Sequence, residues 1–402
     1  MRRLGLSFLS TSVVLILAAC GIGVEMQNPP AQTPSTAAAL SGAVTMTTQP
    51  VSPQPSSLVT PMGSGTASQP ADSTVPVEVT PATFASNQIA YVNWLLDEGK
   101  GVLYLGRADG SQAFELAEID QWQTAGLPAW APDGLRIAHV SDGALTVSPL
   151  NGVAFQLTEN NSRAGFPRWS PDGQTLLFTM PLTPEDKIQI SVISATSDQD
   201  PTPLAIADAA AGVPVWSPDG TRIAYVADGA IVVIYADGSN PITLVTGDPA
   251  QPSDLSWSPD GRHLAYIAGQ EGKTGLHVVD TTGRNLVVIM DDSIPDDETS
   301  VPIWSPDGQR IAFVAKRDGD EEIYVANADG SQVTNLTNAP GAQDNQPTWS
   351  PDGQHIAFSS DRAPATGYAV YQMKADGSDQ ARLFPAAGSY FQVGATPLWS
   401  PK

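Results

Sequence analysis

The stretch WSPDGQRIAFV, residues 304–314, combines a tight turn with the beginning of a β-strand. In its turn, Ser305 to Gly308, proline sets φ at the second position, aspartate suits the third, and glycine takes the positive φ that follows. The next residues, RIAFV (310–314), favour a strand, and EIYVANADGS (322–331) and VTNLT (333–337) predict two more. With the short segment PIWS (302–305), the region predicts four consecutive strands.

The same motif recurs along the chain. Complete copies of Trp-Ser-Pro-Asp-Gly, one of them with alanine in place of serine, begin at Trp130, Trp169, Trp216, Trp257, Trp304 and Trp349, and a seventh, incomplete copy begins at Trp399. Successive tryptophans are 39 to 50 residues apart. This spacing is typical of β-propeller blades, each of which is a four-stranded antiparallel sheet.

The two ends of the repeat region predict how the ring closes. Residues 87–119 have the pattern of the second, third and fourth strands of a repeat, without a first strand that contains tryptophan. The final residues, ATPLWSPK (395–402), supply a first strand and nothing after it. We therefore predict an all-β fold, a seven-bladed β-propeller over residues 87–402, in which the N- and C-terminal strands together complete one blade. Closure of this kind protects strand edges that an open array would expose.

These repeats resemble the TolB-like propeller family, whose WD40-like repeat is named for the Pro-Asp pair. The resemblance covers about residues 88–402 and is clearest in NLTNAPGAQDNQPTWSPDGQHIAFSSDR (335–362). It implies a noncatalytic binding or scaffolding module, with the short Asp-Gly turns on one face of the ring and the long, irregular loops on the other. The protein that names the family has an α/β domain before a six-bladed propeller, whereas this sequence has a different N-terminal region.

That N-terminal region has the layout of an export signal. Residues 1–19 contain two arginines, an apolar run and small residues, and Leu17 to Cys20 resembles a bacterial lipobox. Cys20 is the only cysteine, so we predict that it carries the lipid, although an ordinary signal peptide is the alternative. Residues 20–86 are rich in Pro, Ser, Thr and Ala and predict a disordered tether. The expected location is the bacterial cell envelope, outside the cytoplasm, at a membrane that the sequence leaves open as inner or outer.

The charge balance limits the partners. Acidic residues outnumber basic ones by 42 to 19, which gives a net charge of -23. A chain of this charge repels phosphate backbones, so a nucleic-acid partner is not expected. We predict a monomeric propeller whose partner is an envelope protein, a peptide or a glycan, reached from a membrane through the lipid anchor.

Groups suited to catalysis are sparse. The four histidines, His139, His263, His277 and His355, have no ligand-like spacing, and we expect all four on strand or turn surfaces. His263 and His355 stand where other repeats have arginine. The repeated aspartates are explained by turn chemistry. We therefore predict no catalytic residue, no metal site and no cofactor. The alternatives are a glycan lyase or hydrolase that uses the loop side, and a structural lipoprotein without a specific ligand.

Two candidate patches fall on the predicted loop side. Loops around the closing blade carry four aromatic residues that predict a binding patch, unless they simply cap the core: Trp94, Trp122, Tyr390 and Phe391. Two other loops predict an acidic sector, which would bind calcium or a basic partner segment or else be a solvated surface: Asp291, Asp292, Asp296, Asp297, Glu298, Asp318 and Asp320.

Overall fold

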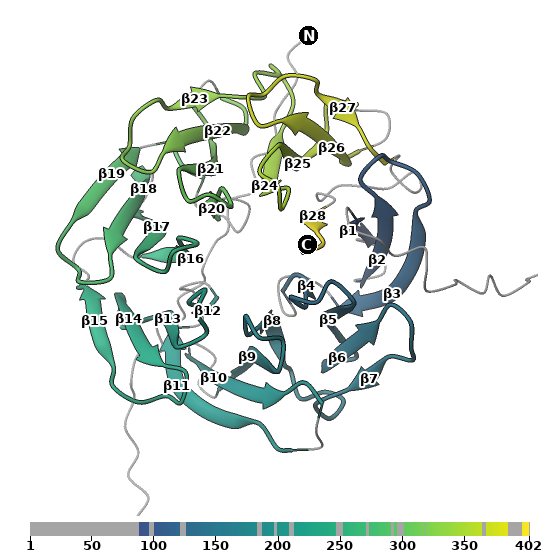
Figure 1. The fold of residues 1–402 in the computed structure, drawn as a ribbon, viewed down its shortest axis with the longest axis vertical. Coiled ribbons are helices and arrows are strands. Elements are labelled where there is room, and N and C mark those ends of the chain that lie inside the picture. Colours follow the sequence, from purple (N-terminus) through teal and green to yellow (C-terminus); the bar gives the residue numbers. More distant parts are fainter. Residues whose placement is uncertain are drawn as a thin grey trace, which may run out of the picture. The chain divides into compact units, whose positions relative to one another are not determined.

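A computed structural model describes residues 88–95, 100–120, 126–182, 187–196, 199–208, 213–246, 252–270, 273–290, 293–295, 301–317, 319–363, 367–384 and 396–401. Within these residues the chain forms 28 strands in seven four-stranded sheets, arranged as the blades of a ring (Figure 1). The predicted all-β, seven-bladed propeller is confirmed. No helix long and apolar enough to cross a membrane occurs in the described part of the chain.

Every blade has the same order of strands, from the axis of the ring outward (Figure 1). The innermost strands are β28 (Thr396–Trp399), β4 (Ala129–Trp130), β8 (Gly165–Trp169), β12 (Val215–Trp216), β16 (Ser253–Trp257), β20 (Ile303–Trp304) and β24 (Asp344–Trp349). The second strands are β1 (Gln88–Leu95), β5 (Arg136–Ser141), β9 (Thr175–Pro181), β13 (Arg222–Ala227), β17 (His263–Gln270), β21 (Arg310–Ala315) and β25 (His355–Ser360). The third strands are β2 (Lys100–Arg107), β6 (Ala144–Pro149), β10 (Lys187–Ser194), β14 (Ala230–Tyr235), β18 (Lys273–Asp280), β22 (Glu322–Asn327) and β26 (Ala369–Lys374). The outermost strands are β3 (Phe114–Asp120), β7 (Phe155–Gln156), β11 (Thr202–Asp208), β15 (Ile242–Val245), β19 (Leu286–Met290), β23 (Thr334–Asn335) and β27 (Ala381–Arg382).

The blade of residues 303–335 illustrates how the repeat folds. Ile303 and Trp304 of β20 pair with β21, and β21 pairs antiparallel with β22 along its whole length. The predicted strand VTNLT (333–337), the fourth and outermost of this blade, is shorter than its pattern suggests, because only Thr334 and Asn335 form β23. Since the strands are antiparallel, the turns after the first and third strands of each blade lie at the same end of the ring. We call this end the turn face and the opposite end the loop face.

One blade joins the two ends of the repeat region. Strand β28 pairs antiparallel with β1, with Trp399 opposite Ile89 and Leu398 opposite Ala90. Just beyond the ladder, the Ser400 amide donates to the Gln88 carbonyl at 2.9 Å, and the Gln88 amide donates to Ser400 Oγ at 3.1 Å. The predicted closure of one blade by the N- and C-terminal strands is therefore confirmed.

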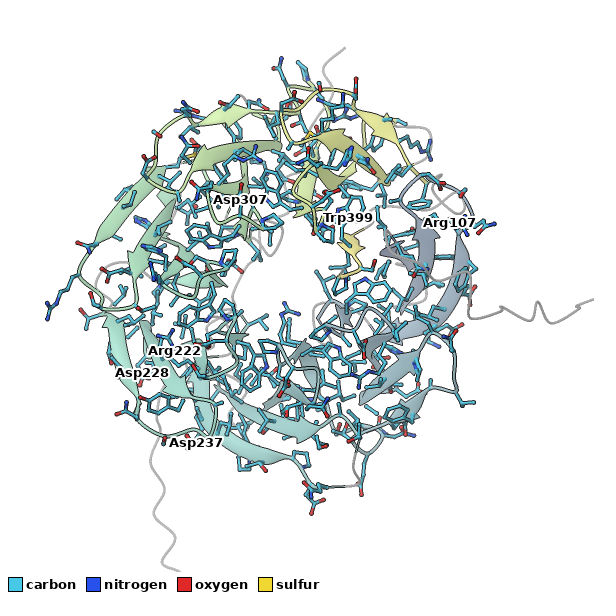
Figure 2. All side chains as sticks on the ribbon, in the orientation of Figure 1. Arg107, Arg222, Asp228, Asp237, Asp307 and Trp399 are labelled. Carbon is cyan, nitrogen blue, oxygen red and sulfur yellow. The ribbon has the colours of Figure 1, made fainter. Side chains whose placement is uncertain are left out.

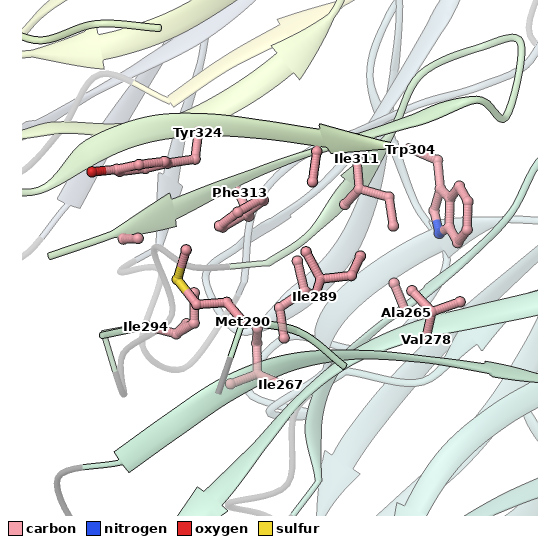
Figure 3. Close-up of a cluster of buried hydrophobic side chains, with 13 residues drawn as sticks. Ala265, Ile267, Val278, Ile289, Met290, Ile294, Trp304, Ile311, Phe313 and Tyr324 are labelled. Carbon is pink, nitrogen blue, oxygen red and sulfur yellow. The ribbon is translucent and has the colours of Figure 1, made fainter. Parts of the chain in front are cut away.

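The hydrophobic core is divided among the blade interfaces. The described residues contain seven clusters of buried apolar side chains, one between each pair of neighbouring blades. In the cluster between β16–β19 and β20–β23, the Trp304 indole lies at one end, beside Ala265 and Val278, and Phe313 and Tyr324 lie farther along (Figure 3). Because both faces of a blade pack on neighbours, its middle strands are buried on both sides. In β21, for example, every residue from Ile311 to Ala315 is buried.

Candidate binding site at the blade interfaces

The tryptophan of every repeat connects two blades by a hydrogen bond. The Trp304 indole N–H donates to the Ser256 carbonyl at 3.1 Å, and Ser256 directly precedes the tryptophan of the previous blade. The other six indoles repeat this bond at 3.0 to 3.4 Å, in the pairs Trp130–Leu398, Trp169–Ala129, Trp216–Arg168, Trp257–Val215, Trp349–Ile303 and Trp399–Thr348. The seven bonds form a closed circle near the inner rim, where Figure 2 labels Trp399.

The Ser-Pro-Asp-Gly turns carry a fixed pattern of hydrogen bonds. Ser305 Oγ donates to Asp307 Oδ1 at 2.6 Å and accepts from the Arg310 amide at 2.9 Å, while the Gly308 amide donates to the Ser305 carbonyl at 2.8 Å. Gly308 has a φ of 70°, which glycine adopts without strain. The same serine hydroxyl bond to aspartate holds the turns at Ser170, Ser217, Ser258 and Ser350.

These serine bonds set the charge of the turn face. The hydroxyl of Ser170 lowers the pKa of Asp172, and its counterparts do the same for Asp219, Asp260 and Asp307. A hydrogen bond to a carboxylate favours its charged form. These four carboxylates are therefore ionised at neutral pH and below.

The first residue of the second strand reaches across to the next blade when it is arginine. The Arg136 guanidinium lies 4.6 Å from the centre of the Trp169 ring, and its Nη2 donates to the Gly173 carbonyl at 3.0 Å. It also forms a 2.8 Å ion pair with Asp133 of its own turn. Arginine over the face of an aromatic ring is attracted by the negative face of the ring. Arg136 thus has three partners at this interface: a ring, a carbonyl and a carboxylate.

Two more arginines cover tryptophans in the same way. Arg222 lies 4.9 Å from the ring of Trp257 and donates to the Gly261 carbonyl at 3.0 Å. Arg310 lies 4.6 Å from the ring of Trp349 but donates to the Ala375 carbonyl at 3.2 Å. The arginine position therefore closes three interfaces of the ring.

In three other complete repeats the arginine is replaced, by Thr175, His263 and His355, and beside the first two a cavity opens on the turn face. Thr175 leaves a cavity of about 310 Å³ beside Trp216. His263 leaves a cavity of about 590 Å³ beside Trp304. Trp216 is half-buried, whereas Trp169, beneath an arginine, is only 7% exposed. We refer to these two places as the open interfaces.

Both open interfaces have acidic walls. Asp172 and Asp219 line the smaller cavity together with Gly220. Asp260, Asp307 and Asp329 line the larger one together with Gly308. The pKa of Asp329 is also lowered, by the hydroxyl of Ser331. At neutral pH each cavity therefore offers carboxylates, backbone of the next turn and the indole of a tryptophan.

The larger cavity is partly occupied by its own histidine. The ring centres of His263 and Trp304 are 6.4 Å apart and tilted, and Trp304 is only 7% exposed. Arg262 extends into solvent beside it, with a side chain 81% exposed and its Nε 4.0 Å from Asp260 Oδ2. Among the described residues that line the cavity at Thr175 there is no arginine and no ring other than that of Trp216. The interface at Thr175 is the more accessible of the two.

The predicted aromatic patch falls largely outside the described residues. Trp122, Tyr390 and Phe391 lie there entirely. Trp94 was expected in a loop, but its backbone belongs to β1, opposite Gly101 of β2, and its side chain is not described. The patch therefore stays a prediction, with one of its members placed on a strand end.

The predicted acidic sector is described at one residue only. Asp320 is half-buried and accepts hydrogen bonds from the Gly341 amide at 2.7 Å and from Gln343 Nε2 at 3.4 Å. These bonds hold the loop that leads to the next blade. The other six acids lie outside the described residues: Asp291, Asp292, Asp296, Asp297, Glu298 and Asp318. Their role as a sector stays a prediction.

Buried acids next to Asp320 are also engaged in structure. Glu322 accepts hydrogen bonds from the Thr337 hydroxyl and from the Ala339 amide, and burial raises its pKa. Asp344 is fully buried and forms a 2.6 Å ion pair with Arg362. Burial raises the pKa of Asp344 as well. Glu322 therefore holds the segment that follows β23, and the ion pair joins β24 to the segment that follows β25.

The histidines do not all lie at the surface, as the sequence had suggested. His139 is 3% exposed, its Nε2 lies 2.9 Å from Ser148 Oγ, and burial lowers its pKa to about 4. His277 is half-buried and stacks on Tyr266, with ring centres 5.3 Å apart. The expectation of a surface position is wrong for His139, because neighbouring blades cover both faces of its strand.

Sequence reasoning placed binding on the loop face and did not single out the open interfaces. Their signal was visible, since His263 stands where other repeats have arginine. Its meaning depends on a contact between blades that one repeat alone does not reveal. Within the described ranges, no group of three or more His, Cys, Asp or Glu side chains is arranged to hold a metal ion.

Comparison with known proteins agrees with the repeat and the ring. The family described as the TolB beta propeller domain matches residues 229–402. Residues 229–402 of the propeller are therefore similar to this family. No curated protein matches the sequence. TolB from Acinetobacter baumannii is similar in structure with a TM-score of 0.47 and 20% identity, over 61% of this chain and 62% of that one. This chain therefore spans less than two thirds of that protein.

Two enzymes contain a similar propeller. A puromycin-hydrolysing peptidase of Mycobacterium tuberculosis gives a TM-score of 0.56 at 15% identity, over 75% of this chain and 54% of that one. An oligogalacturonate lyase from Vibrio parahaemolyticus gives a TM-score of 0.53 at 16% identity, over 72% of this chain and 91% of that one. At such identities these similarities establish the fold that this propeller shares with them, and nothing about its activity.

Proposed function

We propose that this protein is a noncatalytic binding or scaffolding propeller of the cell envelope, held at a membrane by a lipid on Cys20. The observation that carries the proposal is the pair of open interfaces, at Trp216 and Trp304, in a ring where Arg136, Arg222 and Arg310 cover the tryptophans of three corresponding joints. A rigid ring with shaped, polar hollows is suited to recognition. The match of residues 229–402 to the TolB propeller domain supports the same role.

The chemistry of the open interfaces favours binding over catalysis. A general acid or base works best with a pKa near the operating pH. Here the serine hydroxyls hold the pKa of Asp172, Asp219, Asp260 and Asp307 below the ordinary value, so these groups stay charged at neutral pH. Permanently ionised carboxylates beside an aromatic ring attract a cationic partner.

A protein or peptide of the envelope is the proposed partner, with a glycan as the alternative class. The proposal is tested by capture of partners from envelope extracts on the immobilised full chain, followed by identification of the retained proteins. Retention of a reproducible partner, competed by the same protein in solution, is expected. A chain that retains nothing above a control surface contradicts the binding role, and turnover of a glycan panel would indicate an enzyme instead.

The aromatic patch on the loop face remains part of the proposal. Changing Trp122 and Tyr390 together to alanine is expected to reduce partner retention if this patch takes part. The far-ultraviolet circular dichroism spectrum serves as the check that the propeller still folds. Unchanged retention in a folded variant removes the patch from the binding surface and leaves the open interfaces as the candidate.

The anchor has a separate test. Inhibition of the lipoprotein signal peptidase with globomycin is expected to leave an unprocessed, larger chain, and Cys20→Ser is expected to release the protein from the membrane fraction. A mature size that does not respond to globomycin contradicts lipidation. Partner capture does not depend on this result, so the two parts of the proposal fail independently.

A further inference from the structure

We propose that the two open interfaces bind arginine side chains of a partner protein or peptide, one at Thr175 and Trp216 and one at His263 and Trp304. This inference rests on the proposed binding function and assigns it a site and a ligand chemistry. Its basis is that the ring already binds arginine in this way at other joints, where the arginine is its own.

Arg136 provides the template for the site. Its guanidinium lies 4.6 Å from the centre of the Trp169 ring, donates to the Gly173 carbonyl at 3.0 Å, and pairs with Asp133 at 2.8 Å. The ring of the next blade, the glycine of the next turn and the aspartate of the preceding turn therefore surround one planar cation. A guanidinium suits this arrangement because its donors are fixed in a plane and its face stacks on aromatic rings.

The interface at Thr175 has the same three partners without the arginine. Trp216 supplies the ring, Gly220 the next turn, and Asp172 the preceding turn, and all three line the cavity of about 310 Å³. At Asp133 the turn is bonded through Oδ1 and the arginine through Oδ2. The turn bonds to Asp172 from Ser170 and Gln174 likewise go to Oδ1.

The interface at His263 has the same three kinds of partner and two additional aspartates. Trp304, Gly308 and Asp260 correspond to the three partners of the template, and Asp307 and Asp329 add negative charge. His263 lies near the indole, and Arg262 lies 4.0 Å from Asp260. An incoming arginine has to displace the His263 ring from the indole and compete with Arg262 for Asp260. The Thr175 interface is therefore expected to bind more tightly.

The surroundings select arginine among cations. The chain carries a net charge of -23, which attracts positively charged segments and slows the approach of acidic ones. A lysine side chain brings the charge but not the planar fork that reaches ring, carbonyl and carboxylate together. Citrulline keeps the shape of arginine but has no charge. Affinity is expected to decrease in the order arginine, lysine, citrulline.

Titration calorimetry or ligand-observed NMR with the full chain tests the proposal directly. The probes are Nα-acetyl-arginine amide and the matching lysine and citrulline amides. A single side chain is expected to bind with a Kd on the order of a millimolar. The citrulline probe is expected to bind at least about 10-fold more weakly, since it loses both the charge and the charge-assisted hydrogen bonds. Equal binding of arginine and citrulline, or no binding of arginine, overturns the proposal.

Substitution inside the repeat gives the specific control. Thr175→Arg and His263→Arg place an arginine at each open interface, as Arg136 and Arg222 do at other interfaces. The double variant is therefore expected to fold and to lose at least about 10-fold in arginine affinity. Thr175→Arg alone is expected to have the larger effect. Gln174→Arg is the matched control, because it adds the same charge one residue away, at the exposed position that corresponds to Arg262 in another repeat. Like Arg262 it can compete for the carboxylate but does not cover the ring, so it is expected to cause a smaller loss than Thr175→Arg. Unchanged binding in the double variant, or equal loss in the control, overturns the assignment.

A second pair of variants keeps the test valid if the first fails to fold. Asp172→Asn and Asp260→Asn retain an oxygen for the serine hydroxyl and remove the charge that faces the cavity. Together they are expected to weaken arginine binding at least about 5-fold, with the lysine probe affected to a similar degree. Arginine binding that is unaltered by both substitutions contradicts the site.

Partner capture separates this inference from the proposed function. A wild-type chain that binds the arginine probe but retains no envelope partner leaves the site in place and refutes the proposed function. A chain whose partner is retained equally by wild type and by the Thr175→Arg, His263→Arg double variant keeps the function and refutes the site as its means of binding.

Discussion

Replacing His139 with glutamine is expected to remove a loss of stability that the wild-type protein suffers when the pH falls from 7.5 to 5. His139 is 3% exposed, its Nε2 lies 2.9 Å from Ser148 Oγ, and burial lowers its pKa to about 4. In the unfolded chain a histidine has a pKa of about 6.5. Between these two values the unfolded state binds more protons, so the free energy of unfolding falls as the pH falls.

The size of the effect follows from the two pKa values. Each pH unit between them is worth about 1.4 kcal/mol, so the fully expressed difference is about 3 kcal/mol, reached near pH 4. At pH 5 about 2 kcal/mol of it is present. Glutamine keeps a polar group near Ser148 but cannot take up the proton. Groups whose pKa is raised, such as Glu322 and Asp344, act in the opposite direction but equally in both proteins.

Urea denaturation at pH 7.5 and pH 5, followed by tryptophan fluorescence, measures this difference. With a slope of about 3 kcal/mol per molar urea, the wild-type midpoint is expected to fall by about 0.7 M more than that of the variant. His355→Gln, at a half-buried position in the equivalent strand of another blade, is the matched control and is expected to follow the wild type. If wild type and His139→Gln change by the same amount, within about 0.5 kcal/mol, His139 does not contribute as we infer.

Three further predictions concern the ring itself. Deleting residues 395–402 removes β28 and its indole bonds and is expected to abolish the cooperative urea transition, whereas an unchanged midpoint would mean that the ring does not need this strand. Arg222→Met keeps the apolar stem over Trp257 but loses the cation and its bond to Gly261; a loss of about 1 to 3 kcal/mol is expected in the same assay, against less than about 0.5 kcal/mol for the exposed Arg262→Met. Ala131→Ser restores the turn hydroxyl that five other complete repeats contain and is expected to stabilise the protein by about 1 kcal/mol, so a lower midpoint would contradict our account of the turn.

The architecture could be predicted because its information is local and repeated. The turn at Ser305 to Gly308 needs only neighbouring residues to form, and each strand after it shows its own pattern. Six complete copies of the motif predict six uninterrupted blades. The seventh is predicted because residues 88–119 lack a first strand and residues 396–399 supply one. None of these steps requires knowledge of how two blades pack together.

The errors and omissions arise where two blades meet. His139 was expected at the surface because an alternating strand usually has one exposed face, but β5 is covered on both faces. Within one repeat the arginine position is an ordinary strand start, and its contact with the next blade, Arg136 over Trp169, is visible only in the structure. The sequence shows that threonine replaces arginine at position 175. It does not show that a cavity results, because the arginine of this position contacts a tryptophan of the next blade, as Arg136 contacts Trp169, 33 residues farther along the chain.

The motif has two roles, which are contact with the neighbouring blade or strand and formation of the hairpin turn. The incomplete repeat at Trp399 shows the first role without the second. Its tryptophan donates to the Thr348 carbonyl at 3.2 Å, as every other repeat tryptophan donates to the previous blade. Ser400 Oγ accepts from the Gln88 amide at 3.1 Å, as Ser305 Oγ accepts from Arg310 at the corresponding strand start. The Pro401 carbonyl lies beside Gly134 of the next turn, 3.4 Å from where a Cβ would stand.

The residues retained at this place, Trp, Ser and Pro, are therefore those that contact another blade or the strand beside it. The strand beside β28 comes from residues 88–95 and not from a hairpin, and Lys402 stands where the other repeats have aspartate. The same comparison explains why the arginine position varies. Arginine at this position is needed neither for the contact between blades nor for the turn. The indole hydrogen bonds and the turn bonds both form with Thr175 or His263 there. A position that the ring can leave unfilled is the one at which a partner can supply the missing side chain.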